Sequence, residues 1–115
     1  MRLVSWNCRG LGNPTKAEAI KDLLKMEPSD ILMLQETKIE GSALLDISKK
    51  KWRKNAGTAV SSRGSSGGLA TLWSEDFFQL KNTHETQHWI YTELLHIPSK
   101  LNFSLFNLYV PVIYS

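Results

Sequence analysis

Four large apolar residues, Ile-Leu-Met-Leu, stand in a row at positions 31–34, and a polar stretch from Gln35 to Lys38 follows them directly. Such a run predicts a strand buried on both faces, with a turn of buried helix as the alternative. The turn-forming pair Ser29-Asp30 in front of the run favours the strand. Because ligands commonly bind just beyond the carboxyl ends of strands, Glu36 is a candidate functional carboxylate. A hard cation would be a suitable partner for it, whereas a solvated Glu at the end of an isolated strand is the alternative.

The pattern before this run predicts a strand at residues 3–6, a loop at 7–14 with two glycines and an Asn-Pro pair, and then a helix. The Asn-Pro pair suits the first positions of the helix, which continues to residue 26 or 27, before Pro28. Strand, helix and strand in this order predict parallel pairing through a right-handed crossover. Both strands then end at one edge of the sheet, so Asn7 is expected beside Glu36.

The amide of Asn7 can both donate and accept hydrogen bonds, which suits a binding site. A turn-forming Asn that bonds to its own backbone is the alternative interpretation. Two polar groups that meet at one edge nevertheless favour a site there.

Residues 41–55 read as a second helix that closes in a basic segment. Cations at the end of a helix complement its dipole, and this is the favoured interpretation. Contact with a phosphate backbone and a nuclear-localisation signal are the alternatives. The basic segment consists of five cations around Trp52: Lys49, Lys50, Lys51, Arg53 and Lys54.

The remainder of the chain predicts strands. A Ser- and Gly-rich turn at 61–68, without the Lys-Ser/Thr ending of a Walker loop, leads into a buried strand at 69–73. Three more strands, at 77–81, 88–97 and 102–110, are spaced as an antiparallel meander. Both faces of the last strand are mostly apolar, so the sheet is expected to be covered on two sides. The histidines lack the spacing of metal ligands: His84, His88 and His96.

Composition limits the class of protein. With 115 residues, of which 42% are hydrophobic and 22% charged, the chain is expected to form one globular domain with a core. No apolar run approaches the roughly 20 residues of a spanning helix, and residues 1–6 hold no signal-peptide core. The single Cys8 excludes an internal disulfide and fits a reducing, intracellular compartment. The net charge of +3 tilts the chain weakly toward anionic partners such as nucleic acid.

Four segments resemble, in order, the sequence blocks of a known superfamily. They are Leu-Val-Ser-Trp-Asn-Cys-Arg-Gly-Leu (3–11), Leu-Gln-Glu-Thr-Lys (34–38), Gly-Gly-Leu-Ala-Thr-Leu-Trp (67–73) and Asn-Leu-Tyr-Val-Pro (107–111). These resemble the first four blocks of the endonuclease/exonuclease/phosphatase superfamily, which includes apurinic/apyrimidinic endonucleases. The sequence of residues 6–14 is most similar to the endonuclease domain of plant non-LTR (LINE-type) retrotransposons.

The resemblance implies a fold of class α/β (α+β), a four-layer sandwich of two packed sheets with helices outside. The second half of the family's domain carries a Gly-Asp-x-Asn block, a further Asp and a Ser-Asp-His block, and this chain has none of them. Residues 1–115 are therefore expected to be a partial domain, the N-terminal half, with one mixed β-sheet and helices on one face. The other face of strands such as 69–73 and 103–110 would then lack cover and promote self-association.

By position, the resemblance implies a catalytic role for Asn7, Glu36 and Tyr109. Glu36 matches the metal-binding Glu, Asn7 matches the Asn that orients this Glu and the phosphate, and Tyr109 matches the Tyr that hydrogen-bonds the phosphate. Glu36 and Asn7 would hold one side of a hydrated Mg²⁺ (or Mn²⁺), with binding weakened by the missing ligands. Five cations are candidates for contact with nucleic acid: Arg9, Lys38, Lys50, Lys51 and Arg53.

Two functions of different class follow from this. The first is a Mg²⁺-dependent phosphodiester hydrolase, a DNA endonuclease domain that is inactive alone because the general-base Asp and the catalytic His have no counterpart. The second is a catalytically dead remnant that at most binds nucleic acid weakly through its basic segment. A family member that acts on phosphoinositides or sphingolipids is disfavoured by residues 6–11. DNA is the expected partner, the nucleus is a compatible location, and no membrane association is expected.

Overall fold

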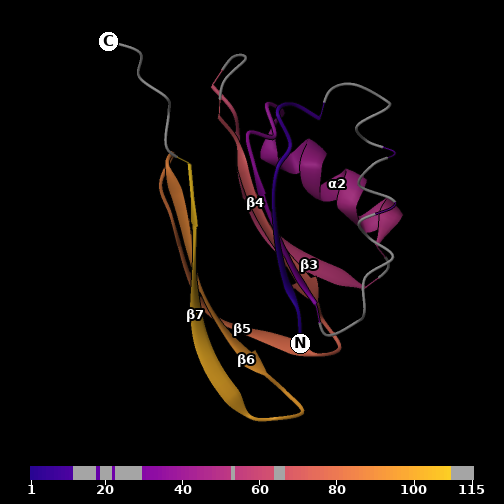
Figure 1. Cartoon of the computed structure of the whole chain (residues 1–115), viewed down its shortest axis with the longest axis vertical. Helices are drawn as coiled ribbons and strands as arrows, with labels where there is room; N and C mark the ends of the chain where they lie inside the picture. The colour runs from indigo at the N-terminus through magenta and orange to yellow at the C-terminus, as the bar shows by residue number, and fades with distance from the viewer. Residues whose placement is uncertain (12–17, 19–21, 23–29, 53, 64–66, 110–115) are drawn as a thin grey trace.

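The computed structural model describes residues 1–11, 18, 22, 30–52, 54–63 and 67–109 (Figure 1). Within them the chain forms strands in two sheets and the helix α2. The bounds are β1 (Leu3–Asn7), β2 (Ile31–Gln35), α2 (Gly41–Lys51), β3 (Asn55–Val60), β4 (Leu69–Ser74), β5 (Phe78–Glu85), β6 (Trp89–His96) and β7 (Leu101–Leu108).

The first sheet is mixed and has the strand order β1-β2-β4-β3. β1 pairs with β2 in parallel, with Asn7 opposite Gln35, so the predicted parallel pairing is confirmed. The helix predicted between these strands lies outside the described residues, apart from Glu18 and Asp22, which are helical. β4 runs antiparallel to β2 on one side and to β3 on the other. The carboxyl ends of β1 and β2 and the start of β4 therefore meet at one edge of this sheet.

The helix α2 covers one face of the first sheet. Its residue Leu44 and the following Trp52 belong to one buried core cluster with Leu32 and Leu34 of β2 and Leu72 of β4. The side chains of a strand alternate between its two faces, so Leu32 and Leu34 point to the same side. The apolar run at the centre of the sequence is thus a strand, as predicted, and half of it forms the core beneath α2.

The prediction that this helix would run to residue 55 is wrong. Residues 55–60 form β3, which pairs with β4 along its whole length. The segment reads Asn-Ala-Gly-Thr-Ala-Val and carries no strand-like alternation of large apolar residues, so pairing with β4 decides its conformation. Asn55 contributes to the end of the helix, because its side-chain amide donates to the carbonyl oxygens of Ser48 (2.7 Å) and Trp52 (2.6 Å).

The last three strands form a second sheet with the order β5-β6-β7, and all pairs in it are antiparallel. The predicted meander is therefore confirmed, but the prediction of one single sheet is wrong. A second core cluster lies between the sheets and contains Ile31 and Trp73 from the first sheet and Phe78 and Leu94 from the second. β4 is apolar on both faces and needs cover on both. The chain supplies that cover by folding the meander over the face opposite α2.

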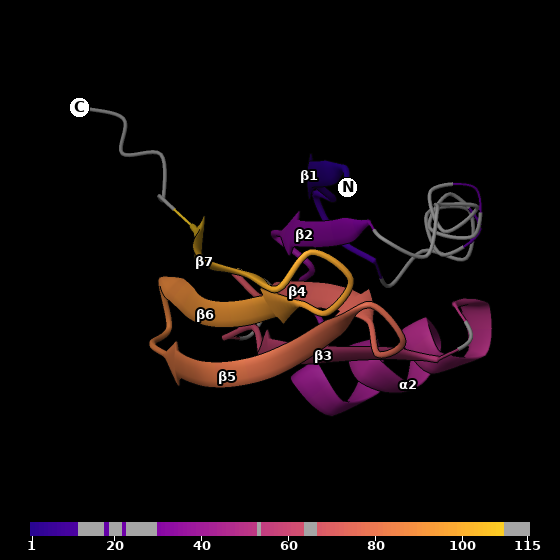
Figure 2. The ribbon, with the colours of Figure 1, turned by 90° about the horizontal axis from the view of Figure 1, so that it is seen from below.

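The molecule consequently has three layers in the described part: the meander, the mixed sheet and α2 (Figure 1). Figure 2 shows that β7 lies on the side of β1 and β2, whereas β5 lies on the side of β3. This arrangement confirms the predicted α/β (α+β) class. No described helix is long and apolar enough to cross a membrane.

The expectation of an uncovered sheet face is wrong for one of the two strands that it named and is confirmed for the other. Every residue of β4 is buried, so the strand predicted at 69–73 has cover on both sides. The strand predicted at 103–110 does expose apolar surface, on the outer side of the meander, where Phe106 and Leu108 of β7 are 56% and 55% exposed. The chain therefore closes a core of its own between its two sheets.

Candidate functional site

The candidate site lies at the edge of the first sheet where β1 and β2 end. The segment after β1 continues alongside the segment after β2 by backbone hydrogen bonds: the amide of Cys8 donates to the carbonyl of Gln35 (2.8 Å), and that of Gly10 donates to the carbonyl of Glu36 (2.7 Å). The two loops are thus held together beyond the ends of their strands. Glu36 is fixed in the middle of this ladder.

The segment after β2 is also attached to the residues that open β4. The amide of Thr37 donates to the carbonyl of Gly68 (3.2 Å), and that of Lys38 donates to the carbonyl of Gly67 (2.9 Å). Three segments that are far apart in the sequence therefore meet at one edge. They contain three of the four sequence blocks singled out above.

This edge concentrates unusual backbone conformation. Left-handed φ values are uncommon for residues other than glycine and cost about 1–2 kcal/mol each, so they persist only where the surrounding structure imposes them. Of the five non-glycine residues with positive φ in the described part of the chain, three lie in these three segments, and the three glycines with positive φ lie there too. They are Arg9 (φ 54°), Gly10 (101°), Glu36 (52°), Lys38 (56°), Gly67 (78°) and Gly68 (95°). Strain of this kind is typical of binding and catalytic loops.

Gly68 shows how tightly these segments are packed. A Cβ placed on it would lie 2.1 Å from Oγ1 of Thr37 and 3.0 Å from the backbone nitrogen of Lys38. The first distance is shorter than any real contact and the second is tighter than most, so a Cβ here would force Thr37 or the Lys38 backbone to shift, and the φ of 95° would add strain for any other residue. The second glycine of the third sequence block, Gly68, therefore has a steric reason.

Asn7 and Glu36 lie at this edge as predicted. Glu36 is half-buried, and it follows the last residue of β2. Asn7 is exposed, and its Oδ1 accepts a hydrogen bond from the backbone nitrogen of Arg9 at 3.2 Å. The turn-forming role considered as an alternative for Asn7 is thus present. It does not conflict with a role in binding, because a carboxamide oxygen has a second lone pair.

Tyr109 reaches the same edge from the second sheet. It is half-buried and follows the last residue of β7, and its backbone nitrogen donates to the carbonyl of His88 (2.7 Å). A Cβ on Gly67 would lie 4.0 Å from Cε1 of its ring. Because the carbonyl of Gly67 accepts a hydrogen bond from the amide of Lys38, the tyrosine ring lies beside the loop that follows Glu36.

Asn107 holds the two sheets together behind this edge, a role that sequence reasoning missed. It is 1% exposed. Its Nδ2 has the carbonyl oxygens of Leu34 (3.2 Å) and Ala70 (2.8 Å) within hydrogen-bond distance, and its Oδ1 accepts from Nε2 of Gln35 (2.8 Å). Asn107 is two residues before Tyr109, and Gln35 directly precedes Glu36. The network therefore couples the strand ends that carry two of the candidate residues.

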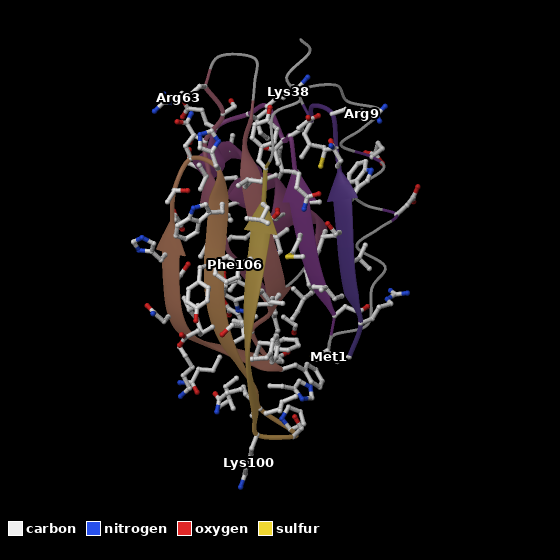
Figure 3. The ribbon with its side chains drawn as sticks, turned by 60° about the vertical axis from the view of Figure 1, so that its left-hand side comes forward. Met1, Arg9, Lys38, Arg63, Lys100 and Phe106 are labelled. Carbon is white, nitrogen blue, oxygen red and sulfur yellow. The ribbon has the colours of Figure 1, made fainter. Side chains whose placement is uncertain are left out.

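The predicted nucleic-acid contacts divide into two groups. Arg9 and Lys38 are exposed at the candidate edge, and Figure 3 shows them at the same end of the molecule as Arg63. Lys50 and Lys51 are the last residues of α2. Their side chains, and the whole of Arg53, lie outside the described part of the structure.

Two contacts bear on the basic segment. Trp52 is buried in the core, 7% exposed, so it offers no ring for a base to stack on. Nζ of Lys54 lies 3.6 Å from Oδ2 of Asp76. Both observations favour the interpretation of these cations as a solvated helix end.

A cleft opens beside the candidate edge. It has a volume of about 490 Å³ and lies between the end of β3 with its following loop (59–63) and the turn between β5 and β6 (85–87). Two hydrogen bonds connect its wall to the segment after Glu36, from the amide of Gly41 to Oγ of Ser61 (2.9 Å) and from the amide of Ser62 to the carbonyl of Ile39 (3.1 Å). The cleft thus adjoins the site and can accommodate part of an extended ligand.

The donor atoms at this edge limit the chemistry that the chain supports. Among the described residues, no three His, Cys, Asp or Glu side chains gather closely enough to share a metal ion. One carboxylate and one amide oxygen fit a single face of a hydrated Mg²⁺, which keeps several of its waters when it binds to protein. The residues present therefore fit such an ion in part.

A mixed sheet covered by a helix on one face and a meander on the other defines an α/β (α+β) protein, and the polar loops at the carboxyl ends of its parallel strands are its candidate ligand site. The sequence pattern of the Endonuclease/Exonuclease/phosphatase family matches residues 4–111, and the chain belongs to that family. No curated protein matches the chain.

Solved structures of the same fold include the AP endonuclease LMAP from Leishmania major (TM-score 0.70, 19% identity, 95% of this chain and 40% of that one). The APE2 catalytic domain from Xenopus laevis (0.65, 20%, 96% and 45%) and the human Nocturnin catalytic domain with bound sulfate anion (0.67, 18%, 90% and 47%) are also similar. The chain thus spans less than half the length of each. At these identities the likeness shows the fold.

Proposed function

We propose that the chain is the N-terminal part of a Mg²⁺-dependent phosphodiester hydrolase that cleaves DNA, as in the endonuclease domain of a LINE-type retrotransposon, and that it is inactive alone. The observation that carries the proposal is the convergence of Asn7, Glu36 and Tyr109 at one sheet edge. Backbone hydrogen bonds among three segments, and the side chain of the buried Asn107, fix the conformation of that edge. Membership of the family and the likeness to a solved AP endonuclease support the reaction class.

In this proposal each residue has a role that its chemistry allows. When bound, a Mg²⁺ would supply neutralisation of the charge on the phosphoryl oxygens. The Glu36 carboxylate and the Asn7 amide oxygen would hold one side of the hydrated ion, and the Tyr109 hydroxyl would donate a hydrogen bond to a non-bridging phosphate oxygen. Arg9 and Lys38 attract the DNA backbone.

The proposal assigns the remaining groups to residues outside this chain. Among the described residues no group of three His, Cys, Asp or Glu side chains could share a metal ion, and the sequence holds no counterpart of the family's general-base Asp or catalytic His. Loss of a general base alone costs about 10²–10⁴ in rate. Tyr109 and β7 lie at one rim of the site, and β1 is an edge strand beside it. In this proposal the rest of the domain would complete the site from the side on which β1 and β7 lie.

The alternative proposal is a catalytically dead remnant that binds nucleic acid weakly through its basic segment. Its observed support is limited to the exposure of Lys49 and Lys54, since Trp52 is buried and Lys54 pairs with Asp76. The geometry at the sheet edge favours the first proposal.

The test is nicking of supercoiled and abasic DNA with Mg²⁺. We expect the purified chain to give no nicking above background, and the chain mixed with the second half of an intact family enzyme to recover activity. Glu36→Ala should then abolish the recovered activity. Glu40→Ala is the matched control, because Glu40 is an exposed carboxylate four residues away, at the N-cap of α2, with no side-chain capping hydrogen bond.

Two results would contradict the proposal. Reproducible nicking by the chain alone that disappears with Glu36→Ala would show that half of the site suffices. Recovered activity that survives Glu36→Ala but not Glu40→Ala would show that the carboxylate has been assigned wrongly.

A further inference from the structure

The layer between the two sheets is apolar at one end and polar at the end beside the candidate site. Its apolar end is the cluster of Ile31, Trp73, Phe78 and Leu94. At its polar end, hydrogen bonds connect Asn107 of the second sheet with Gln35 and Thr71 of the first. Buried polar side chains cost free energy unless they are hydrogen-bonded, and a satisfied network makes the structure around it rigid. The polar end therefore fixes geometry at the place where the candidate residues lie.

Asn107 sets the order of donors and acceptors in this network. Its side chain faces the carbonyl oxygens of Leu34 (3.2 Å) and Ala70 (2.8 Å), which can only accept, so Nδ2 is the atom that turns toward them. Oδ1 of Asn107 then points to Gln35 and can only accept in turn. Gln35 must present Nε2 to it, at 2.8 Å, and the Gln35 amide thus has one orientation that satisfies Asn107.

Gln35 extends this order to β1. Its Nε2 also donates to Oγ of Ser5 (3.0 Å), and the Ser5 hydroxyl lies 3.3 Å from its Oε1. One side chain of β2 is thus hydrogen-bonded to β1 in its own sheet and to β7 in the other sheet. Gln35 is half-buried, so water competes with these bonds only in part.

Each of the three connected side chains comes one or two residues before a candidate residue. The pairs are Ser5 with Asn7, Gln35 with Glu36, and Asn107 with Tyr109. Asn7 is also the cross-strand partner of Gln35, so the two side chains share one face of the sheet. Glu36 has a φ of 52°, so regular strand geometry ends directly after Gln35. The Gln35 side chain is therefore the last anchor of β2 before the candidate carboxylate.

We propose that Gln35 is a positioning residue of the candidate site. Its side-chain amide, oriented by Asn107, holds the ends of β1, β2 and β7 in the relative position that brings Asn7, Glu36 and Tyr109 together. The catalytic consequence rests on the proposed function, whereas the effect on the geometry of the edge does not.

The first test is amide hydrogen exchange of the whole chain, measured by NMR, which needs no nuclease activity. Gln35→Met keeps the length of the side chain and removes its hydrogen bonds. Gln79→Met is the matched control, because Gln79 is an exposed glutamine on β5. The amides that report on the edge are hydrogen-bonded across it, and they are those of Gly10, Thr37, Lys38 and Tyr109. The reference amides are hydrogen-bonded at the opposite end of the two sheets, and they are those of Ile31 and Ile97.

We expect Gln35→Met to raise the exchange rates at the edge by roughly tenfold, the effect of losing one net hydrogen bond, and to leave the reference amides within about twofold. Gln79→Met should change neither set. An equal rise at both ends would show that Gln35 only stabilises the fold as a whole, and unchanged rates at the edge would show that the backbone bonds suffice. Either result overturns the proposal.

The second test is the nicking assay of the chain mixed with the second half of a family enzyme. Because misplacement by about 1 Å can cost 10²-fold in rate, Gln35→Met should lower kcat by roughly 10- to 100-fold and leave KM for DNA unchanged. A higher KM with kcat unchanged would contradict a positioning role. If the unmodified mixture does not nick DNA, the proposed function fails while the exchange result still stands. If it does nick and Gln35→Met equals the unmodified chain in both tests, the positioning role alone fails.

Discussion

Asn107 offers the sharpest test of how the two sheets are joined. Asn107→Ala removes the amide that reaches the carbonyl oxygens of Leu34 and Ala70, two fully buried residues that pair directly across β2 and β4. A buried acceptor that loses its partner costs about 1–3 kcal/mol, so two of them cost roughly 2–6 kcal/mol. Since each carbonyl has a second lone pair, we expect the lower half of this range, about 3 kcal/mol.

The assay is urea denaturation followed by tryptophan fluorescence, with a thermal melt as a second measurement. A loss of about 3 kcal/mol should lower the melting temperature by on the order of 10 °C for a chain of this size. Asn102→Ala is the matched control, because Asn102 lies on the same strand and is exposed. Its effect should stay within about 0.5 kcal/mol.

A third variant separates hydrogen bonding from packing. Asn107→Leu restores most of the lost volume without restoring any donor, so we expect it to be as unstable as Asn107→Ala. If Asn107→Leu were as stable as the unmodified chain, the amide would have no net hydrogen-bonding role. If Asn107→Ala resembled Asn102→Ala, the proposed connection between the sheets would be wrong altogether.

Two further predictions concern the loop packing and the association state. Gly68→Ala should lower the free energy of unfolding, measured by urea titration, by about 1–3 kcal/mol more than Gly67→Ala. Both glycines have positive φ, but only a Cβ on Gly68 would meet Thr37 and Lys38. Equal losses would show that the contact relaxes. Since β4 is covered on both faces, we expect a monomer by light scattering and a cooperative thermal melt. A dimer that Phe106→Ser dissociates would show that the outer face of β7 needs cover.

The sequence by itself determined the parts of the fold that rest on local pattern. The apolar run at 31–34, the segments 3–6 and 69–73 and the three-strand meander are strands as predicted. The parallel pairing of β1 and β2 was predicted from the order strand, helix, strand, so the neighbouring positions of Asn7 and Glu36 were predictable too. The resemblance of four short sequence blocks also predicted the right family, and three of these blocks lie at the sheet edge of the candidate site.

Tertiary structure alone decided how these elements combine. Residues 55–60 are a strand only because β4 offers a pairing edge, and the meander leaves the first sheet because a strand apolar on both faces needs a second cover. Asn107 reads in the sequence as one polar residue in an apolar strand. Its hydrogen bonds reach residues more than 30 positions away in the sequence. These bonds, and the close approach of Gly68 to Thr37, depend on distances in space that no local pattern encodes.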